Sequence, residues 1–342
     1  MSMIIRPIRS EDFPALLKIA EDSGHGFTSL PVNEELLKCK IERSVQSFHK
    51  EVTQAGDESY LFVMEDLDTG CVVGTSAIEA AVGLDDAFYH YHMSKVVHSS
   101  RELDIYNTVD LLTLCNDYTG ATEICTLFLD EGHRINNNGK VLSKMRFMFM
   151  TNYRERFSST IFAEMRGVSD DAGNSPFWQW LQEHFFSMDF PTADYLTGIG
   201  QKQFIAELMP KYPIYVNLLS KEAQSVIGEV HPNTRPAIEM LKSEGFRFRG
   251  YVDIFDAGPT VEAHLDDIQS ARNSVEVEVK IGERSDESSQ AYIVTNLKLK
   301  DFRATQLRFS KHVKDEAHVV LTQKEADALL VSPGDKLRIV AL

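Results

Sequence analysis

The stretch Thr122–Met150, TEICTLFLDEGHRINNNGKVLSKMRFMFM, contains the residues of this chain best suited to binding an anion. It begins with an apolar run, Ile124–Leu129, of the length and composition of a buried strand. A polar turn follows, and apolar residues then recur at helical spacing from Val141 to Phe149. Because loop amides and the positive end of a helix dipole both point at such a connection, this strand, loop and helix form a frame that can hold a pyrophosphate.

Three residues of the turn, Arg134, Asn137 and Gly139, have the spacing R-x-x-N-x-G. This resembles the R-x-x-G-x-G/A pyrophosphate loop of the GNAT superfamily of acyl-CoA N-acyltransferases, with Asn in place of the first glycine. Asn is among the non-glycine residues that tolerate left-handed backbone angles, so the loop conformation stays accessible. The alternative is an ordinary strand-to-helix connection that binds nothing.

Composition and charge restrict the class of ligand. The formal net charge of −16 argues against a general nucleic-acid surface, which needs clustered positive charge, but suits a small cationic substrate. A polyanionic coenzyme then needs a local basic patch, and the residues around the loop that could supply it are Arg134, Lys140, Lys144 and Arg146.

Neither a metal nor a membrane is expected. The four cysteines show no C-x-x-C pair and no metal-ligand spacing, and no carboxylate falls at a ligand-like spacing near His90, His92 and His98. There is no N-terminal signal pattern and no apolar run of spanning length. Unpaired cysteines suit a reducing compartment, so we expect a cytoplasmic protein.

The start of the chain predicts a strand followed by a helix. Met3–Ile8 is a short β-like run, and Phe13–Glu21 is an amphipathic helix that Ser10 could cap. The phrase IRPIRSEDFPALLKIAE is similar to the opening strand and helix of GNAT proteins.

A glycine-bearing loop, Gly24–Pro31, precedes a second predicted helix over Asn33–Phe48. The GNAT resemblance implies that this loop lies beside the acceptor substrate, where Thr28 and Ser29 could form hydrogen bonds. The alternative is that Thr28 and Ser29 make turn bonds and that Asn33 only caps the helix.

Three further strands are predicted before the middle of the chain. Tyr60–Glu65 and Val72–Glu79 form a hairpin, and Ile161–Gly167 is a strand that follows the proposed anion-binding unit. The intervening segment Gly83–Asp117 is less regular.

Two segments resemble the closing motif of the GNAT core. Asn174–Phe186 predicts a helix and Ser187–Phe190 an extended run. The same motif recurs in Thr234–Phe246, which continues into a predicted strand over Phe248–Phe255. Two such segments fit either one elaborated domain or a weak internal repeat.

The predicted fold class is α/β, with a GNAT-like mixed β-sheet flanked by helices over residues 1–260. A small all-β, barrel-like domain is expected over residues 261–342, after the break at Asp256–Pro259. Its strand-like runs are Val275–Ile281, Ala291–Leu299, His318–Leu321 and Lys336–Val340. We identify no chemistry in this second domain.

Long phrases along nearly the whole chain, including YLFVMEDLDTG, CTLFLD, LSKMRFMFM, GQKQFIAELMPKYPIY and GFRFRGYVDIFDAGPT, resemble the bacterial arginine N-succinyltransferase family. The resemblance implies transfer of a succinyl group from succinyl-CoA to the α-amino nitrogen of L-arginine, in arginine breakdown. Succinyl-CoA is then a co-substrate, and no permanently bound cofactor is expected.

The same resemblance implies two site residues. The family's succinyl-CoA contact falls on Leu127, where the strand backbone could contact the pantetheine arm and polarise the thioester carbonyl. Its proton donor falls on His231, in GEVHPNTRP. Both closing-motif segments carry Leu, namely Leu181 and Leu241, where many GNAT enzymes have a proton-donating Tyr. Another group must therefore supply the proton, and imidazole titrates near neutral pH.

We expect direct attack of the amine on the thioester, without an acyl-enzyme. Cys125 is two residues from Leu127, and strand alternation places it on the face of Leu127 and away from Phe128. Glu164 or Asp117 could bind the guanidinium and Arg166 the succinyl carboxylate. Glu164 and Arg166 could equally pair with each other, so neither is assigned to the site.

Two alternative functions remain open: an acetyl-CoA-dependent amine acetyltransferase of the same fold, and a catalytically silent CoA-binding or interaction subunit. The sequence leaves undecided whether ornithine is accepted and whether the chain forms a homo-oligomer or pairs with a related subunit.

Overall fold

The computed structural model describes residues 2–24, 29–170, 173–283, 289–310, 313 and 316–342. A mixed sheet forms its centre, with neighbouring strands in the order β1-β2-β3-β6-β7-β10-β9. The β6–β7 pair is parallel, and the other neighbouring pairs of this run are antiparallel. The strands are β1 Met3–Pro7, β2 Ser59–Asp66, β3 Val72–Glu79, β6 Thr122–Leu129, β7 Thr160–Glu164, β10 Pro259–His264 and β9 Arg247–Val252.

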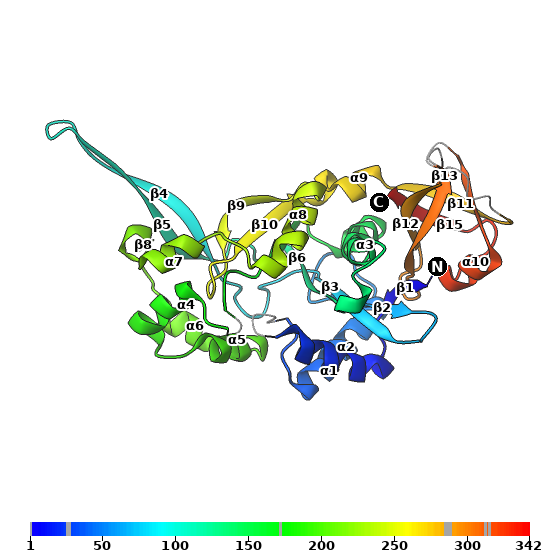
Figure 1. Ribbon diagram of the computed structural model, residues 1–342, viewed down its shortest axis with the longest axis horizontal. Coiled ribbons are helices and arrows are strands. Elements are labelled where there is room, and N and C mark those ends of the chain that lie inside the picture. Colours follow the sequence, from blue (N-terminus) through cyan, green and yellow to red (C-terminus); the bar gives the residue numbers. More distant parts are fainter. Residues whose placement is uncertain (1, 25–28, 171–172, 284–288, 311–312, 314–315) are drawn as a thin grey trace.

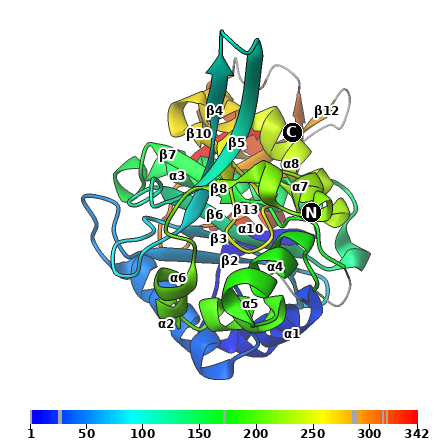
Figure 2. The same cartoon turned by 90° about the vertical axis from the view of Figure 1, so that its left-hand side faces the viewer.

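Helices cover both faces of this sheet (Figures 1 and 2). One face packs against α1, Phe13–Ser23, and α2, Glu34–His49, whose apolar residues meet those of β2 and β3. The other face packs against α3, Asn138–Asn152, α8, Arg235–Glu244, and α9, Gln269–Asn273. The predicted GNAT-like sheet flanked by helices is therefore confirmed.

The helix caps were predicted with mixed success. Asn33 caps α2 as expected, because its side chain accepts a hydrogen bond from the Leu36 amide at 3.1 Å. Ser10 does not cap α1, since it begins a short 3-10 turn. Asp12 immediately precedes α1, but its side chain makes no capping bond to that helix: it accepts from the Arg9 amide at 2.8 Å and from the Arg6 guanidinium at 2.7 Å.

The segment predicted to be irregular, Gly83–Asp117, contains a long hairpin of β4, His90–Ser100, and β5, Ile105–Cys115. It projects far from the body of the molecule (Figures 1 and 2). Among the described residues, the hairpin pairs with the body near its base, where Tyr91 lies opposite Val252 of β9, and midway along β5, where Leu111 and Leu112 lie opposite β8, Ile214–Tyr215. Most of the arm faces water on both sides, so its sequence lacks the apolar alternation that identifies a half-buried strand.

The first closing-motif segment is helical as predicted, but the strand expected after it is absent from these described residues. The helix comprises α4, Pro176–Leu181, and a π-helical turn, Gln182–Phe186. The predicted extended run Ser187–Phe190 is wrong, because a second helix, α5, Phe190–Gly198, begins there. Ser187 in the left-handed region (φ 52°) ends the first helix, and Asp189 caps the next through the Thr192 amide. These helices pack with α6, Gln203–Leu208, and α7, Lys221–Val226, around the hairpin base.

The second closing-motif segment is the one that enters the sheet, because α8 leads directly into β9. The first leads into α5 instead, so among the described residues only the second segment continues into a strand of the central sheet.

The C-terminal strands have a hydrophobic core of their own. Their order is β14-β11-β15-β12-β13, and they join the central sheet where Ile5 of β1 pairs with Ala304 of β13. The elements are β11 Val275–Ile281, β12 Ser289–Asn296, β13 Ala304–Ser310, β14 His318–Leu321, α10 Gln323–Leu329 and β15 Lys336–Ala341. Sequence patterns missed β13, and the division at residue 260 stays a prediction.

Candidate functional site

The parallel strands β6 and β7 pair over only two residues and then separate. Thr122 lies opposite Ile161 and Glu123 opposite Phe162, and no further ladder pair joins these strands in the part of the chain that the structure describes. From Ile124 onward, the β6 backbone that faces β7 therefore lies outside the ladder. Such a strand edge can bond an extended ligand, as an added strand would.

A β-bulge in β6 coincides with this separation. Thr75 of β3 pairs with Phe128 and Ala77 with Cys125, so that two β6 residues, Thr126 and Leu127, lie opposite one residue of β3. Thr126 has a φ of 55°, a conformation that costs a β-branched residue on the order of 1–3 kcal/mol.

The bulge overturns the expected orientation of Cys125. Because one extra residue is inserted, Cys125 and Phe128 both pack against the α1 and α2 core, whereas Leu127 packs on the α3 side. Burial raises the pKa of the Cys125 thiol well above its ordinary value, and the negative charge of Glu123 raises it further. A thiol held neutral in this way is a poor nucleophile.

Arg146 of α3 lies fully buried beneath the bulge. Its Nη1 donates to the Cys125 carbonyl at 3.3 Å, while Nε and Nη2 bond to Ser143 at 2.9 and 2.8 Å. Among the described residues no carboxylate contacts it, and burial lowers its pKa to about 10. The prediction that Arg146 belongs to a basic patch around the loop is therefore wrong. The same holds for Lys144, which forms an ion pair with Glu244 at 2.7 Å.

The loop between β6 and α3 has the local geometry that the sequence suggested. Asn136 and Asn137 adopt φ values of 51° and 64°, and Asn137 is the residue that precedes α3. Arg134 is exposed and donates through Nε to the Leu129 carbonyl at 3.0 Å. Gly139 lies in the first turn of α3, where backbone amides have no acceptor within the helix. This helix end can hold an anion.

His231 lies just past the end of β7. Its amide donates to the Arg166 carbonyl at 2.9 Å, and Val230 forms a bridge with Gly167. Its Nδ1 accepts from the Asn233 amide at 3.2 Å, so a neutral imidazole carries its proton on Nε2. Since β6 and β7 run parallel, His231 and Leu127 both lie toward the carboxyl ends of the two separating strands.

Three carboxylates lie on the α1–α2 face at the same place, and sequence reasoning missed two of them, Glu79 and Glu123. Glu79 of β3 pairs with Glu123 of β6, and Glu164 of β7 is two residues beyond the partner of Glu123. Burial raises the pKa of Glu123 to about 8, and the negative charges of Glu164 and Glu79 contribute to the same shift. The sequence contains a signal for this site, because Glu123 is a carboxylate directly before the apolar strand run Ile124–Leu129, where a charged group is unusual.

The other charged residues considered in the sequence have different partners from those expected. Glu164 Oε1 lies 2.9 Å from the ring Nε2 of His90, and the expected pair between Glu164 and Arg166 does not form. Arg166 bonds to Ser169 at 3.1 Å, and its buried Nε has no partner in the described part of the chain. Asp117 accepts from the Tyr251 hydroxyl at 2.9 Å. Thr28 lies outside the described residues.

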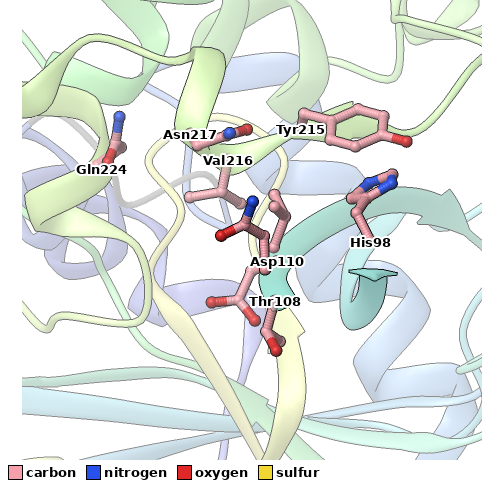
Figure 3. A pocket seen from close by; sticks show the side chains of 9 residues that line it. His98, Thr108, Asp110, Tyr215, Val216, Asn217 and Gln224 are labelled. Carbon is pink, nitrogen blue, oxygen red and sulfur yellow. The ribbon is translucent and has the colours of Figure 1, made fainter. Parts of the chain in front are cut away.

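A separate cavity of about 540 Å³ lies between the outer half of the β4–β5 hairpin and the segment that contains β8 (Figure 3). His98 stacks on Tyr215 there, with ring centroids 6.1 Å apart, and Asp110 pairs with Lys95 at 2.8 Å. None of the predicted site residues lines it, so we place the chemistry at the β6–β7 separation and not in this cavity. Its lining residues are His98, Asn107, Thr108, Val109, Asp110, Tyr215, Val216, Asn217 and Gln224.

The described residues contain no group of three or more His, Cys, Asp or Glu side chains that could hold a metal ion. None of their helices is long and apolar enough to span a membrane.

Comparisons with known proteins agree along the whole chain. The family model for the arginine N-succinyltransferase beta subunit matches residues 3–270, and the model for its C-terminal domain matches residues 275–341. Arginine N-succinyltransferases of Citrobacter koseri and Escherichia coli K12 are each 48% identical over 340 residues, which covers 99% of this chain and 98% of theirs.

A solved structure supports the same assignment. Subunit AI of the arginine/ornithine succinyltransferase of Pseudomonas aeruginosa superposes with a TM-score of 0.90 at 38% identity. The superposition covers 99% of this chain and 98% of the Pseudomonas chain.

The raised pKa of Glu123 predicts a pH effect on stability. In the unfolded chain Glu123 loses its proton near its ordinary pKa of 4.5, whereas the folded chain keeps that proton up to a pH of about 8. The free energy of unfolding should therefore fall as the pH rises from 4.5 to about 8. Glu123→Gln should reduce this fall by up to about 1.4 kcal/mol per pH unit in that window. Urea unfolding across the range measures it, with exposed Glu222→Gln as control, and an unchanged pH slope would contradict the assignment.

Proposed function

This chain belongs to the arginine N-succinyltransferase family, and we propose that it transfers a succinyl group from succinyl-CoA to the α-amino nitrogen of L-arginine. The products are N2-succinylarginine and CoA, in arginine catabolism. Identity of 48% over 99% of the chain to enzymes of that name is the observation that carries this proposal. The open strand edge of β6, with an anion-binding helix end beyond it, supports it independently.

Succinyl-CoA binds along β6 in this proposal. Its pyrophosphate lies at the start of α3, against the amides near Gly139 and the side chains of Arg134 and Asn137. The pantetheine arm then runs along the free edge of β6 to Leu127, whose backbone contacts the thioester. The side chain of Leu127 belongs to the core, which is why only its backbone takes part.

The amine attacks the thioester carbonyl directly. Glu123, four residues before Leu127, accepts the proton of the α-ammonium group, because a carboxylate with a pKa near 8 is a competent base at neutral pH. The oxyanion of the tetrahedral intermediate is stabilised by β6 amides near Leu127. The C–S bond then breaks, and His231 donates its Nε2 proton to the departing thiolate.

Assembly with a second copy or a related subunit is part of the proposal. The β4–β5 arm carries exposed Leu103 and Tyr106, 70% and 72% exposed, at its tip. The similar Pseudomonas protein is itself described as a subunit. A cytoplasmic location stays a prediction.

The substrate assignment is tested by release of free thiol. We expect release from succinyl-CoA only when L-arginine is present, and a much lower rate from acetyl-CoA. Equal rates with the two thioesters would favour a general amine acetyltransferase. Binding of CoA without any release would favour a catalytically silent subunit.

The proton-donor role is tested by His231→Ala. Loss of the proton donor should lower kcat about 100-fold or more, with the affinity for succinyl-CoA unchanged. Cys125→Ser is the matched comparison on β6 and should keep near-normal turnover. Normal kcat in His231→Ala would remove the role, and a folded but inactive Cys125→Ser would indicate an acyl-enzyme.

The role of the arm is tested by the double substitution Leu103→Ser and Tyr106→Ser. Sedimentation should give a mass above that of one chain for the unaltered protein, and a lower mass for the variant. A monomeric unaltered protein would contradict assembly of this chain with itself. A variant of unaltered mass would exclude the arm tip as the contact.

A further inference from the structure

We propose that Glu164, Thr260 and His90 form the subsite that binds the guanidinium of the acceptor amino acid. The three residues come from β7, β10 and the start of β4. The inference rests on the proposed function, since it specifies how that function selects a cationic acceptor.

Buried polar atoms without partners point to a ligand here. His90 and Thr260 are each 0% exposed, and Thr260 lies directly opposite Glu164 in the sheet. Within the described chain, the two ring nitrogens of His90 and the hydroxyl of Thr260 form no hydrogen bond. His90 Nε2 lies 2.9 Å from Glu164 Oε1 but not in hydrogen-bond geometry. Buried polar groups normally have partners, and a donor-rich ligand would supply them.

Aromatic rings surround the same spot. Tyr118 stacks on Phe162 with centroids 4.3 Å apart, and meets His90 at 4.8 Å and Tyr251 at 4.9 Å. The Tyr118 hydroxyl bonds to Glu262 at 2.6 Å, so another carboxylate lies at the rim. A guanidinium is planar, weakly hydrated and able to stack on aromatic faces while its N–H groups bond to carboxylates.

The electrostatic environment favours a permanent cation. Burial raises the pKa of Glu164 well above its ordinary value, and the negative charge of Asp253 raises it further. The positive charge of Lys202 lowers it. Burial lowers the pKa of His90 to about 4, so this imidazole is neutral and cannot serve as the counter-ion. A guanidinium keeps its charge at all physiological pH values, and it would stabilise the ionised carboxylate.

The position along the strands also fits the reaction. Glu123 lies opposite Phe162, and Glu164 lies two residues further along β7 on the same face. An extended amino acid could therefore place its α-amine near Glu123, with its side chain crossing Phe162 toward Glu164.

The test compares Glu164→Gln with the unaltered protein by calorimetry, using L-arginine in the presence of saturating CoA. Removing one partner of a buried charge pair should weaken L-arginine binding by at least about 30-fold. The ratio of kcat/KM for L-arginine to that for its neutral isostere L-citrulline should fall by a similar factor. Thr260→Val should weaken L-arginine binding several-fold, and Glu239→Gln, 68% exposed on α8, should leave it unchanged.

Wild-type affinity for L-arginine in Glu164→Gln would overturn the subsite, as would an unchanged ratio to L-citrulline. A fall in that ratio for Glu123→Gln, with none for Glu164→Gln, would assign the guanidinium to Glu123 and also overturn it. If Glu164→Gln does not fold, an unchanged affinity in Thr260→Val decides against the proposal. The calorimetry needs no turnover, so a protein that binds L-arginine but releases no thiol would contradict the proposed function alone.

Discussion

The site depends on the early end of hydrogen bonding between β6 and β7. In a continuous parallel pair, the backbone groups of both strands would be satisfied by each other and closed to a ligand. Here pairing stops after Glu123 and Phe162, and the bulge at Thr126 and Leu127 turns the rest of β6 away from a regular ladder. Arg146 bonds to the Cys125 carbonyl beside the bulge and fixes the distorted backbone from below. The strain at Thr126 is thereby stabilised by a charged group that the core encloses completely.

Opposite charge preferences meet across this one strand. Beyond its carboxyl end, the start of α3 and exposed Arg134 favour an anion. On its α1–α2 face, Glu79, Glu123 and Glu164 favour a cation, and burial, with the nearby charges of Glu164 and Glu79, raises the pKa of Glu123. A polyanionic coenzyme and a cationic acceptor are therefore drawn to different sides of the same backbone, which brings them together only at the bulge.

Features with a local physical cause could be predicted from sequence. The left-handed conformation at Asn137, the Asn33 cap and the strand-to-helix unit at Thr122–Met150 each follow from a few neighbouring residues. The β4–β5 arm could not be, because a strand exposed on both faces carries no periodic apolar signal. The orientation of Cys125 failed for a related reason: one inserted residue reverses the alternation, and no residue type marks a bulge. The Glu164–His90 pair joins strands distant in sequence, so only the fold could bring it together.

The position of β1 has a consequence for biosynthesis. This strand lies between β2 and β13, and its second edge is completed by residues made about three hundred positions later, including Thr305, whose hydroxyl bonds to the Met3 carbonyl at 2.6 Å. While the ribosome is still translating, the amino-terminal strand therefore has an open edge on which another nascent chain could pair. A translation product that stops before Ala304 therefore keeps this strand edge unpaired and open to another chain.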